Sequence, residues 1–394
     1  ENAAALLVDV RDLTVVASVG SADFGDPRIA GQVDGTRARR SPGSALKPFI
    51  YGLAFDQGLL HPMTVLKDAP QAFGAASPEN FDGEFAGPLT AQEALVRSRN
   101  VPAVAVGLQL RAPGFHQFLR EGGIGGLADA QHYGLAVYLG GAEVTMRELA
   151  ALYAMLANGG RWAPLRDARA AAGQATAAAV AEPRRLLSES AAWVTLDMLG
   201  SHPPPAQAFA NSAVRARGPV YWKTGTSTAF RDAWTAGVFD HYVLVVWIGN
   251  FDGRPNPAFV GVERAAPLFF QIVDALRATR APGEPDRPDF MLRPPAELRR
   301  VEVCAASGEL PNAWCPQRVA TWYLPGVSPI RVSALHRALR VDRRSGLLAC
   351  ADAPEAETRV EVFEAWSSDM LELFARAGLP RRRLPAADPR CDAT

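Results

Sequence analysis

The order of strand-like and helix-like segments is the feature that most constrains the fold of this chain. Residues 5–20 are typical of a β-hairpin that turns near Arg11 and Asp12. Four helix-compatible stretches occupy the middle of the chain: 44–58, 90–111, 142–158 and 185–200. Three strand-like runs and a last helix follow: 220–223, 233–239, 242–248 and 262–278. Strands that come both first and last favour one antiparallel sheet flanked by helices, an α+β fold, over a parallel βαβ arrangement.

The chain is long enough for one large domain and one small one. Its 394 residues are 48% hydrophobic and 21% charged, the profile of a globular protein with an apolar core. We expect a first domain at 1–280, a linker rich in proline and charge at 281–295, and a C-terminal region at 296–394. The net charge of +0 predicts no basic face and no nucleic-acid partner. The longest apolar runs, such as 242–248, are too short to span a bilayer.

Lysine is used sparingly, and its positions are informative. Of 41 basic residues only three are lysine, namely Lys47, Lys67 and Lys223, and the others are arginine. A desolvated lysine can lose its proton, whereas arginine stays protonated. Two of the three lysines lie in the motifs described next, which indicates positions that need an amine able to give up its proton.

A serine and a lysine share one predicted helical turn. Gly43 permits a sharp turn before Ser44, and Pro48 is tolerated only in a first helical turn, so a helix should begin near Ser44. Residues i and i+3 share a helix face, which places the Lys47 amine beside the Ser44 hydroxyl. A serine nucleophile needs an adjacent base, and a desolvated lysine supplies one. The backbone N–H of Ser44 at the helix start is also suited to bind a developing oxyanion.

Two further motifs favour the same chemistry. In Ser98-Arg99-Asn100, we interpret Ser98 as a proton shuttle near both lysines, and Asn100 as a donor to a substrate amide that also holds Lys47. The next motif, Lys223–Thr226, follows a strand-like run near the end of the predicted sheet.

The motif at Lys223–Thr226 supplies a binding surface. On an edge strand, Lys223 would point towards the site and Gly225 would leave space for a substrate along the backbone. The hydroxyls of Thr224 and Thr226 would face a substrate carboxylate. The backbone N–H of Thr226 would complete an oxyanion hole with that of Ser44.

The three motifs occur in the order known from class A β-lactamases and penicillin-binding proteins. The competing patterns are missing from the sequence: the six histidines are scattered, none forms HExxH, and no Walker A or GxGxxG motif occurs. We therefore expect a serine acyl-enzyme that needs no cofactor and no metal.

Several segments resemble class A penicillin-binding proteins: 39–49, 80–83, 95–104, 153–160 and 222–227. Three more resemble the 1C branch of that family: 304–315, 324–330 and 376–383. The resemblance covers nearly the whole chain. It implies the penicillin-binding (β-lactamase-like) transpeptidase fold, with a sheet flanked by helices, an all-helical subdomain and a small cysteine-containing C-terminal region.

The resemblance also implies a function. It points to a periplasmic D,D-transpeptidase that joins stem peptides ending in D-Ala-D-Ala to an amine of a neighbouring peptidoglycan stem, and that β-lactam antibiotics acylate. It predicts a longer parent anchored in the bacterial inner membrane, with a glycosyltransferase domain that this sequence does not contain and cell-wall synthesis proteins as further partners. The family's small β-sandwich after the transpeptidase is also expected to be missing from the sequence.

Alternatives within this chemistry differ in what removes the acyl group. A β-lactamase is disfavoured because no ExxxN element follows Asn100 at a comparable distance. A D,D-carboxypeptidase, which uses water in place of the acceptor amine, and a penicillin-sensing scaffold domain with little turnover remain open.

All four cysteines lie in the last quarter of the chain, at positions 304, 315, 350 and 391. An even count in one small region favours two disulfides, and hence an oxidising compartment, over free thiols or a metal site. Four cysteines allow three pairings, and proximity in sequence favours Cys304–Cys315 and Cys350–Cys391.

Overall fold

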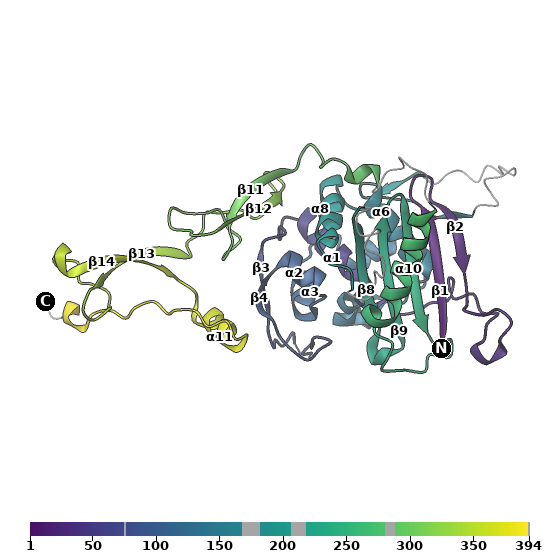
Figure 1. Ribbon diagram of the computed structural model, residues 1–394, viewed down its shortest axis with the longest axis horizontal. Helices are drawn as coiled ribbons and strands as arrows, with labels where there is room; N and C mark the ends of the chain where they lie inside the picture. Colours follow the sequence, from purple (N-terminus) through teal and green to yellow (C-terminus); the bar gives the residue numbers. More distant parts are fainter. Residues whose placement is uncertain (75, 168–181, 206–217, 280–287, 393–394) are drawn as a thin grey trace.

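The computed structural model describes residues 1–74, 76–167, 182–205, 218–279 and 288–392 (Figure 1). Its centre is a six-stranded sheet with the strand order β6-β2-β1-β10-β9-β8. The strands are β1 (Asn2–Asp9), β2 (Thr14–Val19), β6 (Arg166–Asp167), β8 (Val220–Thr226), β9 (Asp232–Phe239) and β10 (Tyr242–Gly249).

The sheet joins the first strands of the chain to the late ones, as the order of segments predicts. β1 and β10 pair antiparallel over their full length, from Asn2 opposite Gly249 to Asp9 opposite Tyr242. β10 pairs with β9, and β9 with β8, also antiparallel, which leaves β8 at the edge. The predicted antiparallel sheet is present, with one addition at its edge: the two-residue β6 pairs in parallel with β2, so the sheet is mixed. A strand of two residues carries too short a pattern to be recognised in the sequence.

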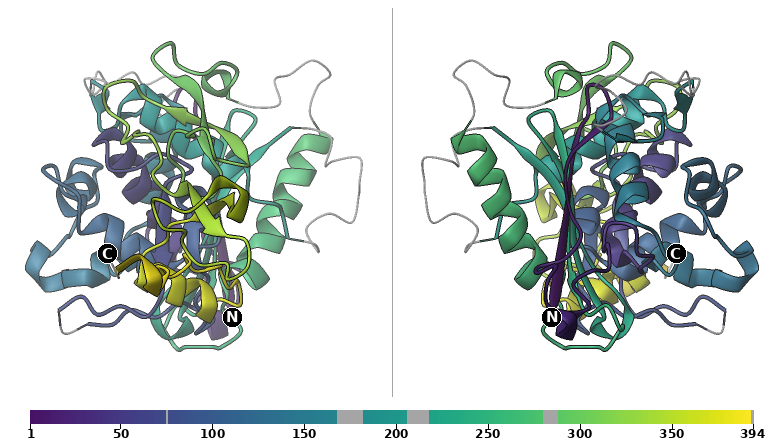
Figure 2. Two further views of the ribbon diagram at one scale, coloured as in Figure 1. Left: turned by 90° about the vertical axis from the view of Figure 1, so that its left-hand side faces the viewer. Right: turned by 90° about the vertical axis from the view of Figure 1, so that its right-hand side faces the viewer.

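Helices cover both faces of the sheet, and Figure 2 shows α10 on one side and the other large helices on the opposite side. In the part of the chain that the structure describes, the α-helices up to residue 278 are α1 (Lys47–Asp56), α2 (Ala91–Val96), α3 (Asn100–Gly107), α4 (Phe115–Glu121), α5 (Ala130–Tyr133), α6 (Met146–Ala157), α8 (Glu189–Gly200) and α10 (Ala266–Ala278). Because both faces are covered, every residue of β9 is buried. Two small antiparallel pairs accompany the large sheet in the described residues: β3 (Val65–Asp68) with β4 (Gly87–Thr90), and β5 (Arg161–Trp162) with β7 (Arg184–Arg185).

Most predicted elements are present, with shifted ends. The capping box at Thr90 is confirmed, since its side chain accepts from the Glu93 N–H and Glu93 accepts from the Thr90 N–H. The sequence predicts one or two helices over 90–111, and the structure has two, because the chain breaks between α2 and α3. β8 runs on to Thr226, where the sequence predicted a turn to have begun.

The C-terminal region forms two separate hairpins and a helix: β11 (Arg299–Cys304) with β12 (Arg318–Tyr323), β13 (His336–Asp342) with β14 (Thr358–Glu364), and α11 (Ser368–Arg376). Figure 1 shows β13 and β14 farther from the large sheet than β11 and β12. Both predicted disulfides, Cys304–Cys315 and Cys350–Cys391, are confirmed. Residues 281–287 of the linker predicted at 281–295 lie outside the described residues, and the described part includes a short 3-10 helix, η7 (Asp289–Met291). No helix among the described residues is long and apolar enough to cross a membrane.

Candidate active site

Ser44 lies in a 3-10 turn, η2 (Gly43–Leu46), that leads directly into α1. Gly43 has φ +52°, and a Cβ on it would lie 2.3 Å from the Thr226 carbonyl oxygen. A side chain there would therefore collide with β8. A Cβ on Gly225 would lie 2.0 Å from the Pro42 oxygen, so this glycine also permits the edge strand to approach the serine turn. The predicted substrate-facing role of Gly225 stays a prediction.

Lys47 is completely buried one helical turn after Ser44. Its Nζ donates to the Ser98 carbonyl oxygen and to Asn100 Oδ1, both at 2.6 Å. Burial lowers the pKa of Lys47 well below its usual value, and the positive charges of Lys223 and Arg99 lower it further. Within the described residues no hydrogen bond joins Lys47 to Ser44. Such contacts are often long in a free enzyme and tighten when substrate binds.

Ser98 connects the two lysines of the site. It lies between α2 and α3 with φ +59°, a left-handed conformation that is uncommon for serine. Its carbonyl oxygen accepts from Lys47 Nζ, and its hydroxyl accepts from Lys223 Nζ at 2.7 Å. Ser98 therefore lies near both lysines in the structure, where the sequence predicted it.

Lys223 reaches the site from the edge strand β8. Its side chain is completely buried, and this burial lowers the pKa of Lys223 to about 7. Besides Ser98 Oγ, its amine donates to the Thr224 carbonyl oxygen at 3.1 Å. An amine with a pKa near neutrality can both accept and release a proton at physiological pH, which suits proton transfer.

The hydroxyl of Thr226 accepts a hydrogen bond from the Gly261 N–H at 3.0 Å. Its own proton therefore remains available for an acceptor such as a carboxylate. A Cβ on Gly43 would lie 3.0 Å from the Thr226 nitrogen, so the residue before Ser44 packs on the backbone of Thr226. The two proposed oxyanion donors thus lie on segments that are in direct contact.

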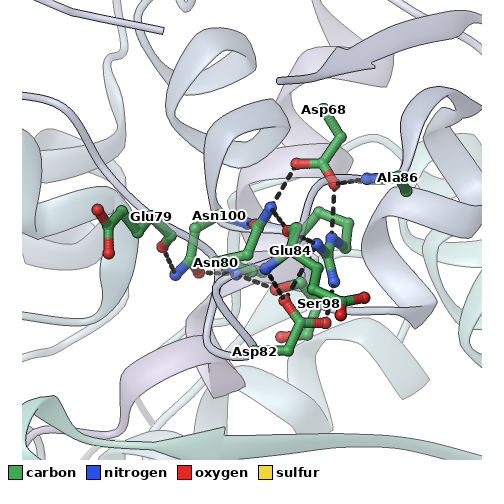
Figure 3. Close-up of polar contacts among 10 residues, drawn as sticks. Asp68, Glu79, Asn80, Asp82, Glu84, Ala86, Ser98 and Asn100 are labelled. Atoms are coloured by element: carbon green, nitrogen blue, oxygen red, sulfur yellow. Dashed lines mark hydrogen bonds and ion pairs between the residues drawn. The ribbon is translucent and has the colours of Figure 1, made fainter. Parts of the chain in front are cut away.

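Figure 3 shows a polar cluster that holds Asn100 in place, and that sequence reasoning missed. The Asn100 N–H donates to Asn80 Oδ1, and Asn100 Nδ2 donates to the Glu79 carbonyl oxygen, both at 2.7 Å. Asn80 in turn donates to Asp68 Oδ1 at 2.7 Å. The stretch 80–83 appeared in the sequence only as part of a family resemblance, and Asp68 gave no signal.

One group of side chains in the described part of the chain has metal-ligand geometry. One ligand atom from each of Cys304, Cys315 and His336 lies within 4.8 Å of the others. The two sulfurs are bonded to each other, however, so neither is a thiolate that could bind zinc.

A serine at a helix start, a buried lysine one turn later and a second buried lysine on the edge strand together define a serine acyl-transfer site of the penicillin-binding type. The chain belongs to the penicillin binding protein transpeptidase domain family, which matches residues 3–261. Residues 294–338 match the C-terminal domain of penicillin-binding protein 1A.

Curated relatives agree with this assignment. Penicillin-binding protein 1C of Escherichia coli (strain K12) is 36% identical over 98% of this chain and 49% of its own length. Penicillin-binding protein 1F of Bacillus subtilis (strain 168) is 29% identical over 78% of the chain and 43% of its own length. The chain thus spans about half, or less, of the relatives that it matches.

Solved structures share the fold. Penicillin-Binding Protein 1A from Haemophilus influenzae aligns with a TM-score of 0.67 and 19% identity, covering 84% of this chain and 54% of that one. PonA1 from Mycobacterium tuberculosis, solved in complex with penicillin V, aligns with a TM-score of 0.57 and 19% identity, covering 74% and 84%. These likenesses establish the transpeptidase fold, which the resemblance to class A penicillin-binding proteins predicted.

Proposed function

We propose that this domain is a peptidoglycan D,D-transpeptidase in which Ser44 is the nucleophile. The observation that carries the proposal is the bridge formed by Ser98, which contacts the amines of both Lys47 and Lys223. Burial favours the neutral form of both amines, and a neutral amine can accept a proton.

The acylation step follows from these positions. Ser44 Oγ attacks the carbonyl carbon between the two terminal D-Ala residues of a donor stem, and its proton passes to Lys47. The N–H groups of Ser44 and Thr226 stabilise the oxyanion. The C–N bond then breaks, and the leaving D-Ala nitrogen takes up a proton delivered through Ser98 and Lys223. The carboxylate of that D-Ala is held by the hydroxyls of Thr224 and Thr226.

Deacylation reverses this chemistry with a new nucleophile. An amine of a neighbouring stem attacks the ester carbon, gives its proton to the same relay, and the Ser44 oxygen leaves as the hydroxyl. A β-lactam acylates Ser44 by the same first step, but its leaving nitrogen stays attached to the adduct. We propose that such adducts persist.

The whole protein's setting belongs to the same proposal. We place the domain in the periplasm, in a parent anchored in the bacterial inner membrane that also carries a glycosyltransferase domain. Peptidoglycan stems are its substrates, and other cell-wall synthesis proteins are its partners. The relatives named above, all penicillin-binding proteins of bacteria, support this placement.

Mass spectrometry after penicillin treatment, with product analysis on a stem-peptide donor and acceptor, tests the function. A Ser44-linked adduct and a cross-linked dimer are expected. A trimmed monomer in place of the dimer would indicate a D,D-carboxypeptidase, and a stable adduct without either product would indicate a penicillin-sensing domain. Labelling that persists in Ser44→Ala would refute the nucleophile.

A further inference from the structure

Arg99 lies between two residues of the site, and its guanidinium binds an acidic cluster formed by the buried Asp68 and the half-exposed Asp82. Its side chain is 6% exposed. Arg99 Nε donates to Asp68 Oδ2, and Arg99 Nη1 donates to Asp82 Oδ2, both at 2.7 Å. The carboxylate of Asp68 is fully buried, so its charge depends on Arg99 for compensation.

The two carboxylate oxygens of Asp68 accept hydrogen bonds from different members of this cluster. Oδ2 accepts from Arg99 Nε and from the Ala86 N–H, whereas Oδ1 accepts from Asn80. Asn80 then accepts the N–H of Asn100. A single buried carboxylate therefore links the guanidinium of Arg99 to the residue that orients Asn100.

The conformation of Ser98 needs such an external restraint. A left-handed serine is unfavourable by itself and persists only where its surroundings fix it. The flanking residues Arg99 and Asn100 are the ones that the cluster holds. With both fixed, the Ser98 hydroxyl points to Lys223 and the Ser98 carbonyl points to Lys47.

We propose that Arg99, held by Asp68 and Asp82, is a positioning residue for acylation, which fixes Ser98 and Asn100 around the amine of Lys47. This inference rests on the proposed function. Arg99 contacts neither lysine and, as we infer, no substrate, and it acts through its two neighbours in the chain.

Charge gives this role a signature that a purely structural role lacks. The charged groups that act on Lys47 are Lys223 on β8, Arg99 before α3 and Asp68 on β3. The charge of Arg99 lowers the pKa of Lys47 and that of Asp68 raises it. The acylation rate falls at low pH as Lys47 becomes protonated, and this part of the pH–rate profile is its acidic limb. Removing either charge should therefore shift the pH of the acidic limb, and the two removals should shift it in opposite directions.

The test measures the rate of acylation by a fluorescent penicillin against pH in the whole 394-residue chain. We expect Arg99→Met to acylate about 100-fold more slowly, because small displacements of reacting groups have effects of that size. Its acidic limb should move to higher pH, whereas that of Asp68→Asn should move to lower pH. Arg99→Lys keeps the charge but cannot contact both carboxylates, so we expect about a tenfold loss with the limb near its original pH.

The matched controls are Arg277→Met and Arg277→Lys. Arg277 on α10 forms the other buried ion pair of the described residues, with Asp240 in the turn between β9 and β10. These variants should lose stability comparably, as thermal unfolding would show, and keep the original rate and acidic limb. The controls thus separate general destabilisation from a specific effect on Lys47.

Each outcome decides the question. If Arg99→Met does not fold, the acylation rates of Arg99→Lys and Asp82→Asn provide the test. The carboxylate of Asp82 is half-exposed in the unchanged protein. A folded Arg99 variant that acylates at the original rate with an unmoved limb overturns the positioning role and leaves the proposed function intact. An unchanged protein that penicillin does not label overturns the proposed function, and this inference with it.

Discussion

Lys47 is the single residue on which acylation should depend most. Its neutral amine is favoured by complete burial and by two neighbouring positive charges. Lys47→Arg keeps a cation but removes the base, since a guanidinium stays protonated. We expect the rate of penicillin acylation to fall by about 10²- to 10⁴-fold, the usual contribution of a general base.

The chain supplies a natural control for that substitution. Lys67 is the one lysine outside the motifs, and its side chain is 50% exposed in a surface ion pair with Asp369. Lys67→Arg should therefore leave the acylation rate unchanged. Rapid acylation of the Lys47→Arg protein, measured by stopped-flow mixing with a chromogenic β-lactam, would show that Lys47 is not the base.

Lys223 should set the pH at which Lys47 becomes active. The positive charge of Lys223 lowers the pKa of Lys47, so removing that charge must raise it. In Lys223→Met, the neutral form of Lys47 then appears only at higher pH, and the acidic limb of acylation moves upward. Lys223→Arg keeps the charge, so its limb should stay close to the original while the rate falls. If the acidic limbs of Lys223→Met and Lys223→Arg lie at the same pH, this electrostatic coupling is contradicted.

At the residue scale, the sequence was sufficient to predict which side chains lie together when they belong to one short motif. Ser44 and Lys47 are three positions apart, and their turn fixes their relation. The contacts of Arg99 with Asp68 join positions that are 31 residues apart. No local periodicity encodes such a pair, because the loop and hairpin between them must fold before the two side chains meet. The acidic cluster was therefore beyond sequence reasoning.

At the scale of elements, capped helix starts were predictable, whereas the exact position of the helix break was not. Thr90 and Glu93 satisfy each other's backbone through contacts three residues apart, which a sequence displays directly. The break before α3 depends on the left-handed Ser98, which is stabilised from outside the helix. That early and late strands share one sheet was likewise predictable, but β6 was not, because it pairs over only two positions.

Two aromatic rings join loops on either side of the site. Phe81 follows Asn80, and Phe230 lies in the turn after β8; their ring centroids are 5.4 Å apart at 66°. Such pairs contribute about 0.5–1.5 kcal/mol. If the two loops must separate to admit a ligand, Phe230→Ala should acylate about 2- to 13-fold faster, the ratio for 0.5–1.5 kcal/mol. Stopped-flow acylation measures this rate.

The control for the ring contact is Phe24→Ala, which removes a ring that is 72% exposed elsewhere on the surface. It should acylate at the original rate. A double-mutant cycle on Phe81 and Phe230 gives their coupling in unfolding free energy. A measurable coupling with an unchanged acylation rate would show that the loops need not part.

At the scale of the whole molecule, the C-terminal region rests on the transpeptidase domain through a few close contacts. Trp322 of β12 packs edge-on against Trp193 of α8, with ring centroids 4.9 Å apart. A Cβ on Gly308 would lie 2.1 Å from the Met63 oxygen, so the loop after β11 touches the first domain's backbone. Residues from both parts, including His61 and Trp366, line a cavity of about 790 Å³ between them.

The disulfides should stabilise this region without affecting the chemistry. Both cross-links join cysteines of the C-terminal region to each other, and the described contacts of the acidic cluster all fall within residues 68–100. In the chain-entropy description, closing loops with sequence separations of 11 and 41 contributes about 3 and about 4 kcal/mol, respectively. Loss of the Cys350–Cys391 bond should therefore destabilise the region more than loss of Cys304–Cys315.

Two double variants test this ranking: Cys350→Ser with Cys391→Ser, and Cys304→Ser with Cys315→Ser. Urea unfolding followed by the fluorescence of the C-terminal tryptophans should give the lower midpoint for the first pair. Penicillin acylation should stay within about twofold of the original in both, since no cysteine contacts the site and distant sites act independently. Because Cys304 is 1% exposed, a hydroxyl placed there could reverse the order. The same variants with alanine in place of serine separate that burial effect from the cross-link, and a ranking that stays reversed with alanine would contradict the loop-length argument.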